Sequence, residues 1–322
     1  MKSISIFPLQ TYCKPLVDTL QQAISQPDPT RFLYKKNVRT PLFMIESLTR
    51  LLKKIHSDSE INEAHKISKK LEDLFGQIDY YDALAKQFSK QKSVTKIQRD
   101  YFIKKRDKII SKANEKLRKR DLYQAIFNEL QQDFKIDFNN KAIVLKIEKQ
   151  IQDELKECFN FYLQYTKGFD DMELQVHEIR RKLRWISIYS QSLQGLITLK
   201  PDKYKYQWEK EFITKSELQS PYNKLVIKKN LPYTITFNQK AFYALSFVIK
   251  NLGEIKDKGL AMEALSKAIK KTSHVLTTNV KTPVTKQLNL NYTEEDLLKQ
   301  AHTLLRKFFI TYKIHNKLIK NG

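Results

Sequence analysis

The chain is poor in the two residues that most often turn a backbone. Its 322 residues include only 6 glycines and 9 prolines. Folds built from many short strands and tight turns use more of both, because glycine supplies positive φ angles and proline presets a turn. Their scarcity argues against a sheet-rich fold. The many lysine, leucine, glutamine and isoleucine residues favour long helices instead.

Residues that hold metals and nucleotides are also few or badly spaced. Cys13 and Cys158 make neither a disulfide framework nor a metal-binding pair, so we expect both as buried thiols in a reducing compartment. The six histidines show no i,i+4 pair and no H-E-x-x-H pattern, and no glycine-rich phosphate loop is present. We therefore expect no metal site, no cofactor and no enzymatic activity.

Long apolar runs are missing as well. No window approaches the roughly 18 apolar residues that a transmembrane helix needs. The N-terminal stretch MKSISIFPLQTYCKPLVD lacks the apolar segment of a secretion signal. These patterns predict a soluble cytoplasmic protein without a membrane partner.

Positive charge is what the chain has in excess. It carries 59 Lys and Arg residues against 35 Asp and Glu, a formal net charge of +24. A field of this size attracts polyanions, and the candidates are nucleic acid, an anionic membrane surface and inorganic polyphosphate. The plainer interpretation is a lysine-rich surface that keeps the protein soluble.

Apolar residues recur at intervals of three and four along most of the chain, which is typical of amphipathic helices. Between about 200 and 237 the texture changes, and NKLVIKKNLPYTITF alternates like two short strands around Asn230, Leu231 and Pro232. We expect an irregular or β-like insertion there. The predicted helices cover roughly 9–25, 31–55, 59–90, 94–133, 139–166, 172–198, 238–253, 257–278 and 293–319.

A faint internal repeat relates the two halves of the chain. The first half contains KNVRTPLFMIESLTRLL and, later, KKLEDLFGQIDYYDAL; the second contains VHEIRRKLRWISIYSQSL and, later, SFVIKNLGEIKDKGLAMEAL. Each half has a helix with a basic start, followed by a helix that carries Gly76 or Gly253. We expect these glycines at helix ends, with Asp82 and Asp257 after them to cap the next helix or to hold an arginine.

The segment QVHEIRRKLRWISIY, residues 175–189, concentrates basic residues on one side of a predicted helix. At about 100° per residue, His177, Arg180, Arg181 and Arg184 share one stripe, while Lys182 and Glu178 project elsewhere. Val176, Ile179, Leu183 and Ile186 form the opposite, packing face. Like charges at i,i+4 repel, and a phosphate anion along the stripe would remove that cost. A basic face that only meets water is the alternative.

The sequence V-H-E-I-R-R-K-L-R-W resembles the signature of the CHAD family, the conserved histidine α-helical domain. His177, Arg180 and Arg184 match its first positions, whereas Trp185 and Ser187 depart from the later basic positions. The family's L-G-x-x-R-D-x-D pattern is similar to L-G-E-I-K-D at 252–257, with Gly259 in place of the second Asp. In the first half, Lys36 takes the place of the histidine, Arg39 follows three residues later and Phe43 seven residues later.

The resemblance implies two pseudo-symmetric bundles of about four helices whose basic helices face a shared groove that holds inorganic polyphosphate. It also implies an association with polyphosphate granules and no catalytic activity.

We therefore predict an all-α protein of two pseudo-repeated antiparallel four-helix-type bundles, residues 1–168 and 169–322, with a basic groove between them. The predicted function is non-enzymatic polyphosphate binding, and the alternative is an RNA- or DNA-binding basic helical protein. The block of basic residues from Lys104 to Arg120 either extends the anion track or is a solvated helix face. The candidate binding residues are His177, Arg180, Arg181, Arg184, Lys182, Lys35, Lys36 and Arg39.

Overall fold

The computed structural model describes residues 8–55, 59–118, 137–227, 231–272 and 281–319. Helices make up most of these ranges, and the extended structure in them is a pair of short strands. The prediction of an all-α protein is therefore confirmed. Within the same ranges, no helix combines the length and the hydropathy that crossing a bilayer requires.

In the first half, the predicted helix over 31–55 is divided in two. Asp28 caps the first piece by accepting a hydrogen bond from the Arg31 backbone, and Asn37 ends it by adopting a left-handed conformation with φ of 52°. The predicted helix over 94–133 is described only to Arg118. The described helices of this half are α1 (Pro8–Ile24), α2 (Pro29–Lys35), α3 (Arg39–Leu52), α4 (Ser59–Ser89), α5 (Lys96–Arg118) and α7 (Lys141–Leu163).

In the second half, the two helices predicted over 238–253 and 257–278 form one continuous helix, α11 (Gln239–Thr272). Gly253 and Gly259 lie inside it, so the expectation that glycine marks a helix end is wrong here. A π-helical turn (Met172–His177) leads directly into α8 (Glu178–Ser192). The described helices that follow α11 are α12 (Lys281–Gln287) and α13 (Glu294–Arg306), and α13 leads into a π turn (Lys307–Thr311) and a 3₁₀ turn (Ile314–Lys317).

The insertion is mostly irregular and contributes one strand, which does not pair with a neighbouring strand of the insertion. Strand β2 (Ile235–Asn238) pairs in parallel with β1 (Ile197–Lys200), which lies outside the predicted stretch. Parallel strands require a crossover connection, and residues 201–234 supply it. This crossover includes α9 (Glu209–Phe212), α10 (Lys215–Gln219) and a 3₁₀ turn (Pro221–Asn223), while residues 228–230 lie outside the described ranges.

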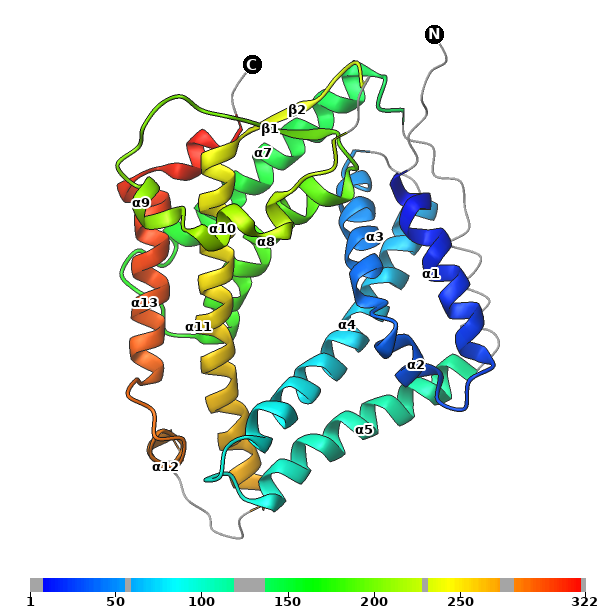
Figure 1. Ribbon diagram of the computed structural model, residues 1–322, viewed down its shortest axis with the longest axis vertical. Coiled ribbons are helices and arrows are strands. Elements are labelled where there is room, and N and C mark those ends of the chain that lie inside the picture. Colours follow the sequence, from blue (N-terminus) through cyan, green and yellow to red (C-terminus); the bar gives the residue numbers. More distant parts are fainter. Residues whose placement is uncertain (1–7, 56–58, 119–136, 228–230, 273–280, 320–322) are drawn as a thin grey trace.

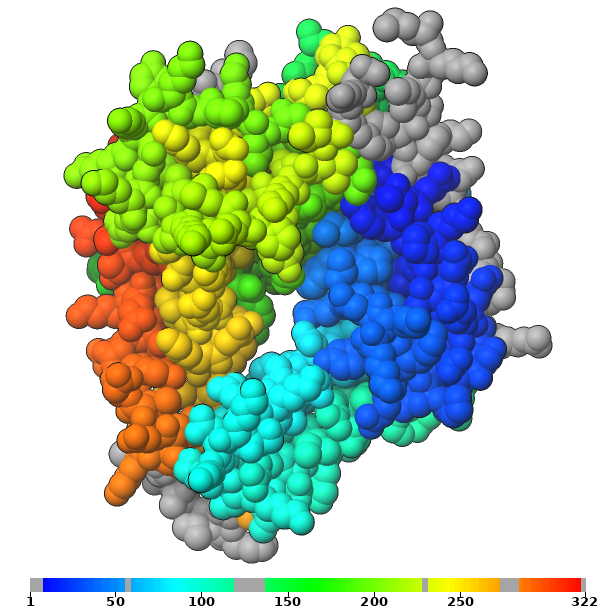
Figure 2. Space-filling view, in the orientation of Figure 1, coloured from blue at the N-terminus to red at the C-terminus, as the bar shows by residue number. Residues whose placement is uncertain are grey.

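The helices surround an open centre (Figure 1). Helix α3 packs against α4 and α8, α4 packs against α5, and α11 packs against α5 and α8, so the contacts close a ring. The space-filling view shows an opening in the middle of the molecule, bordered by α11, α3 and α4 (Figure 2).

Two features hold α3 and α8 beside this opening. The apolar face predicted for α8 is confirmed, because Val176, Ile179, Leu183 and Ile186 are fully buried. Burying such a side chain contributes roughly 1.5–3 kcal/mol. A polar network adds to the contact between the helices: Arg50 of α3 donates to the Tyr189 hydroxyl at 3.2 Å, and that hydroxyl donates to Glu154 of α7 at 2.8 Å.

Candidate functional site

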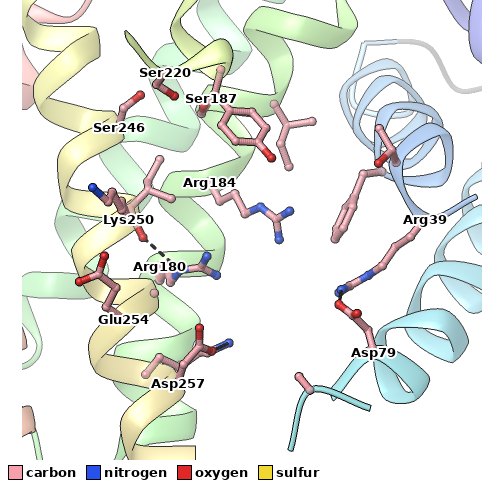
Figure 3. A pocket seen from close by; sticks show the side chains of 18 of the residues that line it. Arg39, Asp79, Arg180, Arg184, Ser187, Ser220, Ser246, Lys250, Glu254 and Asp257 are labelled. Atoms are coloured by element: carbon pink, nitrogen blue, oxygen red, sulfur yellow. Dashed lines mark hydrogen bonds and ion pairs between the residues drawn. The ribbon is translucent and has the colours of Figure 1, made fainter. Parts of the chain in front are cut away.

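The opening contains a cavity of about 830 Å³. Its walls come from α3 and α4 on one side and from α8, α10 and α11 on the other. The face of α8 that lines it runs through positions 180, 184, 187, 188 and 191, a spacing that keeps residues on one side of a helix. In the close view, Arg180 and Arg184 reach from the α8 wall toward Arg39 and Asp79 on the opposite wall (Figure 3).

Arg184 has no hydrogen-bond acceptor and no carboxylate partner among the described residues. Its guanidinium carbon lies 4.3 Å from the centre of the Phe43 ring, a cation–π contact across the cavity between α8 and α3. Burial, followed by the charges of Arg180 and Arg39, lowers the pKa of Arg184 to about 10. The cause of this shift is positive potential in a poorly hydrated place, which an anion would relieve.

Arg180 is held by the backbone of α11. Its Nε donates to the carbonyl oxygen of Ile249 at 3.1 Å, and the guanidinium lies against Gly253. A Cβ atom at position 253 would be 2.9 Å from this Nε, so only glycine leaves room for the side chain as it stands. Burial lowers the pKa of Arg180, the carboxylate of Asp257 opposes that shift, and the charge of Arg39 adds to it.

Arg39, unlike Arg180, is bound by carboxylates. Its Nε donates to Glu72 at 2.8 Å and its terminal nitrogen donates to Asp79 at 2.6 Å. It lies against Gly76 of α4, where a Cβ would be 3.1 Å from the guanidinium, and its guanidinium carbon is 5.0 Å from the Phe43 ring. Arg39 therefore faces the cavity with its charge balanced by two carboxylates.

The aspartates that follow the two glycines do not cap helices, because both lie within long ones. Asp82 accepts hydrogen bonds from Arg106 of α5 at 2.8 Å and from the Tyr34 hydroxyl at 3.2 Å, so it holds an arginine in place, as one of the two expectations had it. Asp257 pairs with Lys256 at 2.8 Å.

The other predicted site residues do not line the cavity. His177 Nδ1 lies 2.9 Å from Glu173, and Glu178 pairs with Arg181 at 2.8 Å and with Lys182 at 3.6 Å. Glu178 does not lie on the basic stripe, yet its side chain reaches Arg181 and Lys182 because they lie three and four positions further along the helix. Lys35, the last residue of α2, and Lys36, which follows it, are exposed, and the ammonium of Lys36 lies 5.5 Å from the Phe32 ring.

The structure therefore brings three of the eight candidates together: Arg39, Arg180 and Arg184. The face of α8 that lines the cavity runs through positions 180, 184, 187, 188 and 191, and Arg181 lies just beside it. His177 belongs to the π turn that precedes α8 and does not line the cavity.

The cavity wall carries acidic side chains that sequence reasoning missed. Its basic residues are Arg39, Arg180, Arg184, Lys250 and Lys256, and its acidic residues are Asp79, Glu217, Glu254 and Asp257. The signal for Phe43 was present, because it occupies the first-half position that corresponds to Arg184. No local pattern could have placed Glu217 and Glu254 beside the arginines.

No metal centre is evident in the part of the chain that the structure describes, since no group of three or more His, Cys, Asp or Glu side chains is arranged to hold an ion. No family model matches the chain, and neither a curated protein nor a solved structure matches it. The resemblance to the CHAD family therefore rests on the motifs given above.

Proposed function

We propose that this protein binds inorganic polyphosphate in its central cavity, without catalysing a reaction. The observation that carries the proposal is Arg184, a half-buried guanidinium without a carboxylate partner among the described residues, which faces the same cavity as Arg180 and Arg39. Arginine forks bind phosphate oxygens in pairs, and the bound anion would offset the repulsion among the three guanidinium groups.

The proposal includes a relationship between the two halves. In each, an arginine near the start of one helix lies against a glycine in a long neighbouring helix: Arg39 against Gly76 and Arg180 against Gly253. This correspondence supports two degenerate repeats, residues 1–168 and 169–322, with the cavity between them. His177, Arg181, Lys182, Lys35 and Lys36 would then contribute to the outer field and not to direct contacts. The proposal implies a cytoplasmic protein that meets its ligand in polyphosphate granules.

The test is a titration of the full chain with polyphosphate at about 0.15 M salt, an ionic strength that screens exposed charges beyond roughly 8 Å. The Arg180→Ala/Arg184→Ala double variant should lose at least tenfold in affinity, because each guanidinium gives charge-assisted hydrogen bonds. Arg181→Ala is the matched control, since it lies on the same helix, is exposed and is paired with Glu178. Equal binding by the double variant and the wild type would disprove the cavity as the site.

The alternative, binding of RNA or DNA, has a different surface in its favour. Helix α5 exposes Lys104, Lys105, Lys108, Lys112 and Lys116, which lie within about a third of the helix circumference. Lys119 and Arg120, from the same basic block, lie outside the described residues. The nucleic-acid alternative predicts that single-stranded RNA or duplex DNA displaces polyphosphate from the protein. It also predicts that the Lys108→Ala/Lys112→Ala variant binds nucleic acid more weakly than the Arg180→Ala/Arg184→Ala variant does.

A further inference from the structure

Most of the positive charge around the cavity is already neutralised. Arg39 is paired with Glu72 and Asp79, Lys256 lies 2.8 Å from Asp257, and Lys250 lies 3.7 Å from Glu217. Glu217 is only 2% exposed, whereas the side chain of Lys250 is 50% exposed. The cations left for a ligand are Arg180, which gives one hydrogen bond to a carbonyl, and Arg184.

The remaining wall is unfavourable for a long polyanion. Glu254 is exposed, lines the cavity and has no partner among the described residues. Asp79 and Asp257 also line it, on opposite sides, and each is paired with a cation, Arg39 or Lys256. A phosphate chain that extended beyond the two free arginines would therefore meet the unpaired carboxylate of Glu254 and no further unpaired cation among the described lining residues, and like charges at close range repel.

The guanidinium groups of Arg180 and Arg184 face the same part of the cavity. Burial is the main cause of the lowered pKa of Arg184, and the nearby charge of Arg180 lowers it further. They lie one helical turn apart on α8 and point the same way (Figure 3). This arrangement provides adjacent donors for one compact oxyanion, with about two positive charges to balance it.

We infer that the unit recognised by the cavity is one or two phosphate groups, such as pyrophosphate or the end of a longer chain, held by Arg180 and Arg184. This inference rests on the proposed function and narrows its ligand class. The one or two phosphate groups that contact Arg180 and Arg184 then determine the affinity, and a longer phosphate chain increases the affinity little. Glu254 limits the negative charge that the cavity accepts.

The experiment is calorimetric titration of the full chain with pyrophosphate, tripolyphosphate and long polyphosphate, each repeated over a series of salt concentrations. We expect one pyrophosphate to bind per protein chain. The dissociation constants of the three ligands, each expressed per bound protein chain, should lie within about tenfold of one another. For long polyphosphate, the slope of log K against log salt concentration should be near −1.5 to −2, the value for about two phosphate contacts; five contacts would give about −4.

Three variants assign the site. Arg184→Ala should weaken pyrophosphate binding about tenfold or more, and Arg181→Ala should leave it within about twofold. Glu254→Gln, which removes the unpaired negative charge, should tighten binding of tripolyphosphate more than binding of pyrophosphate.

The outcomes separate this inference from the proposed function. If long polyphosphate binds through Arg180 and Arg184 with a steep salt slope while pyrophosphate neither binds nor competes, the inference is overturned and the proposed function stands. If pyrophosphate binds equally well to Arg184→Ala, its site is elsewhere and the inference is also overturned. If none of the three ligands binds, both fail.

Discussion

Two arginine sites face each other across the cavity, and they share their geometry but not their electrostatics. Arg39 of α3 lies on Gly76 of α4, and Arg180 of α8 lies on Gly253 of α11. The Nε of each donates to a group four residues before the glycine: the Glu72 carboxylate in the first half and the Ile249 carbonyl in the second. Three residues after the glycine stand Asp79, which binds Arg39, and Lys256, which does not bind Arg180.

The comparison shows how little separates a structural arginine from one that is free to bind a ligand. Each arginine lies against a glycine, and the difference in charge balance comes from two side chains on the long helix. In the first half they are carboxylates and the arginine is neutralised; in the second they are an isoleucine and a lysine, and the charge of Arg180 stays available.

The largest expected contrast is in stability. Arg39→Ala leaves Glu72, which is 8% exposed, without its partner, and should lower the free energy of unfolding by about 2 kcal/mol. Arg180→Ala removes one bond to a backbone carbonyl and relieves repulsion with Arg184, so the loss should be below about 1 kcal/mol. Urea denaturation of both variants measures the difference. If both variants lost the same free energy of unfolding, Arg39 and Arg180 would contribute equally to stability and the contrast would be wrong.

A second test measures how stability depends on pH, which the buried Glu46 and the nearby Glu72 of the first half should influence. Burial, followed by the charge of Glu72, raises the pKa of Glu46 to about 7, so the folded protein favours its neutral form. The unfolded chain ionises near pH 4.3, so this contribution to stability is present below that pH and is lost as the pH rises to about 7.

Glu46→Gln stays neutral at every pH. It should therefore flatten the dependence of stability on pH between about 4 and 7 and stabilise the protein above pH 7 by roughly 1–2 kcal/mol. Thermal unfolding across that range makes the measurement, with the exposed Glu63→Gln in the next helix as the control. A variant whose stability still falls between pH 4 and 7 as in the wild type would rule out Glu46 as the source.

The smallest expected effect concerns the two glycines. Gly253→Ala would place a Cβ 2.9 Å from Arg180 Nε and displace its bond to Ile249, so polyphosphate binding should weaken several-fold. Gly76→Ala meets the far end of the Arg39 side chain at 3.1 Å, where a small shift suffices, and binding should stay within about twofold. Alanine favours a helix over glycine by about 1 kcal/mol, so neither variant should unfold. If Gly76→Ala weakened binding as much as Gly253→Ala, the contrast between the halves would not extend to ligand contacts.

Much of the fold could be read from local patterns. Periodicity located the helices because each buries one face, and the apolar face of α8 was correct residue by residue. The glycine expectation failed at α11, because Gly253 serves a close contact with Arg180, which lies 73 positions earlier in the chain. The partner of β2 could not be read from local patterns for a similar reason, since β1 precedes the insertion and a crossover that no turn signal announces joins the two strands.

The candidate site was predictable only in part. The sequence by itself determined the surplus of positive charge, the helices that carry it and the basic residues of α8, because these depend on composition and on spacings of three and four. The tertiary structure decided which arginine along the cavity stays free, since Glu72 and Asp79 of α4 pair with Arg39 of α3, whereas Arg184 of α8 faces the Phe43 ring. The pairs of Glu178 with Arg181 and Lys182 are local, because they span three and four positions of α8. The pairing of Arg39 joins residues 33 and 40 positions apart, and such distances are set by how helices pack and not by any local pattern.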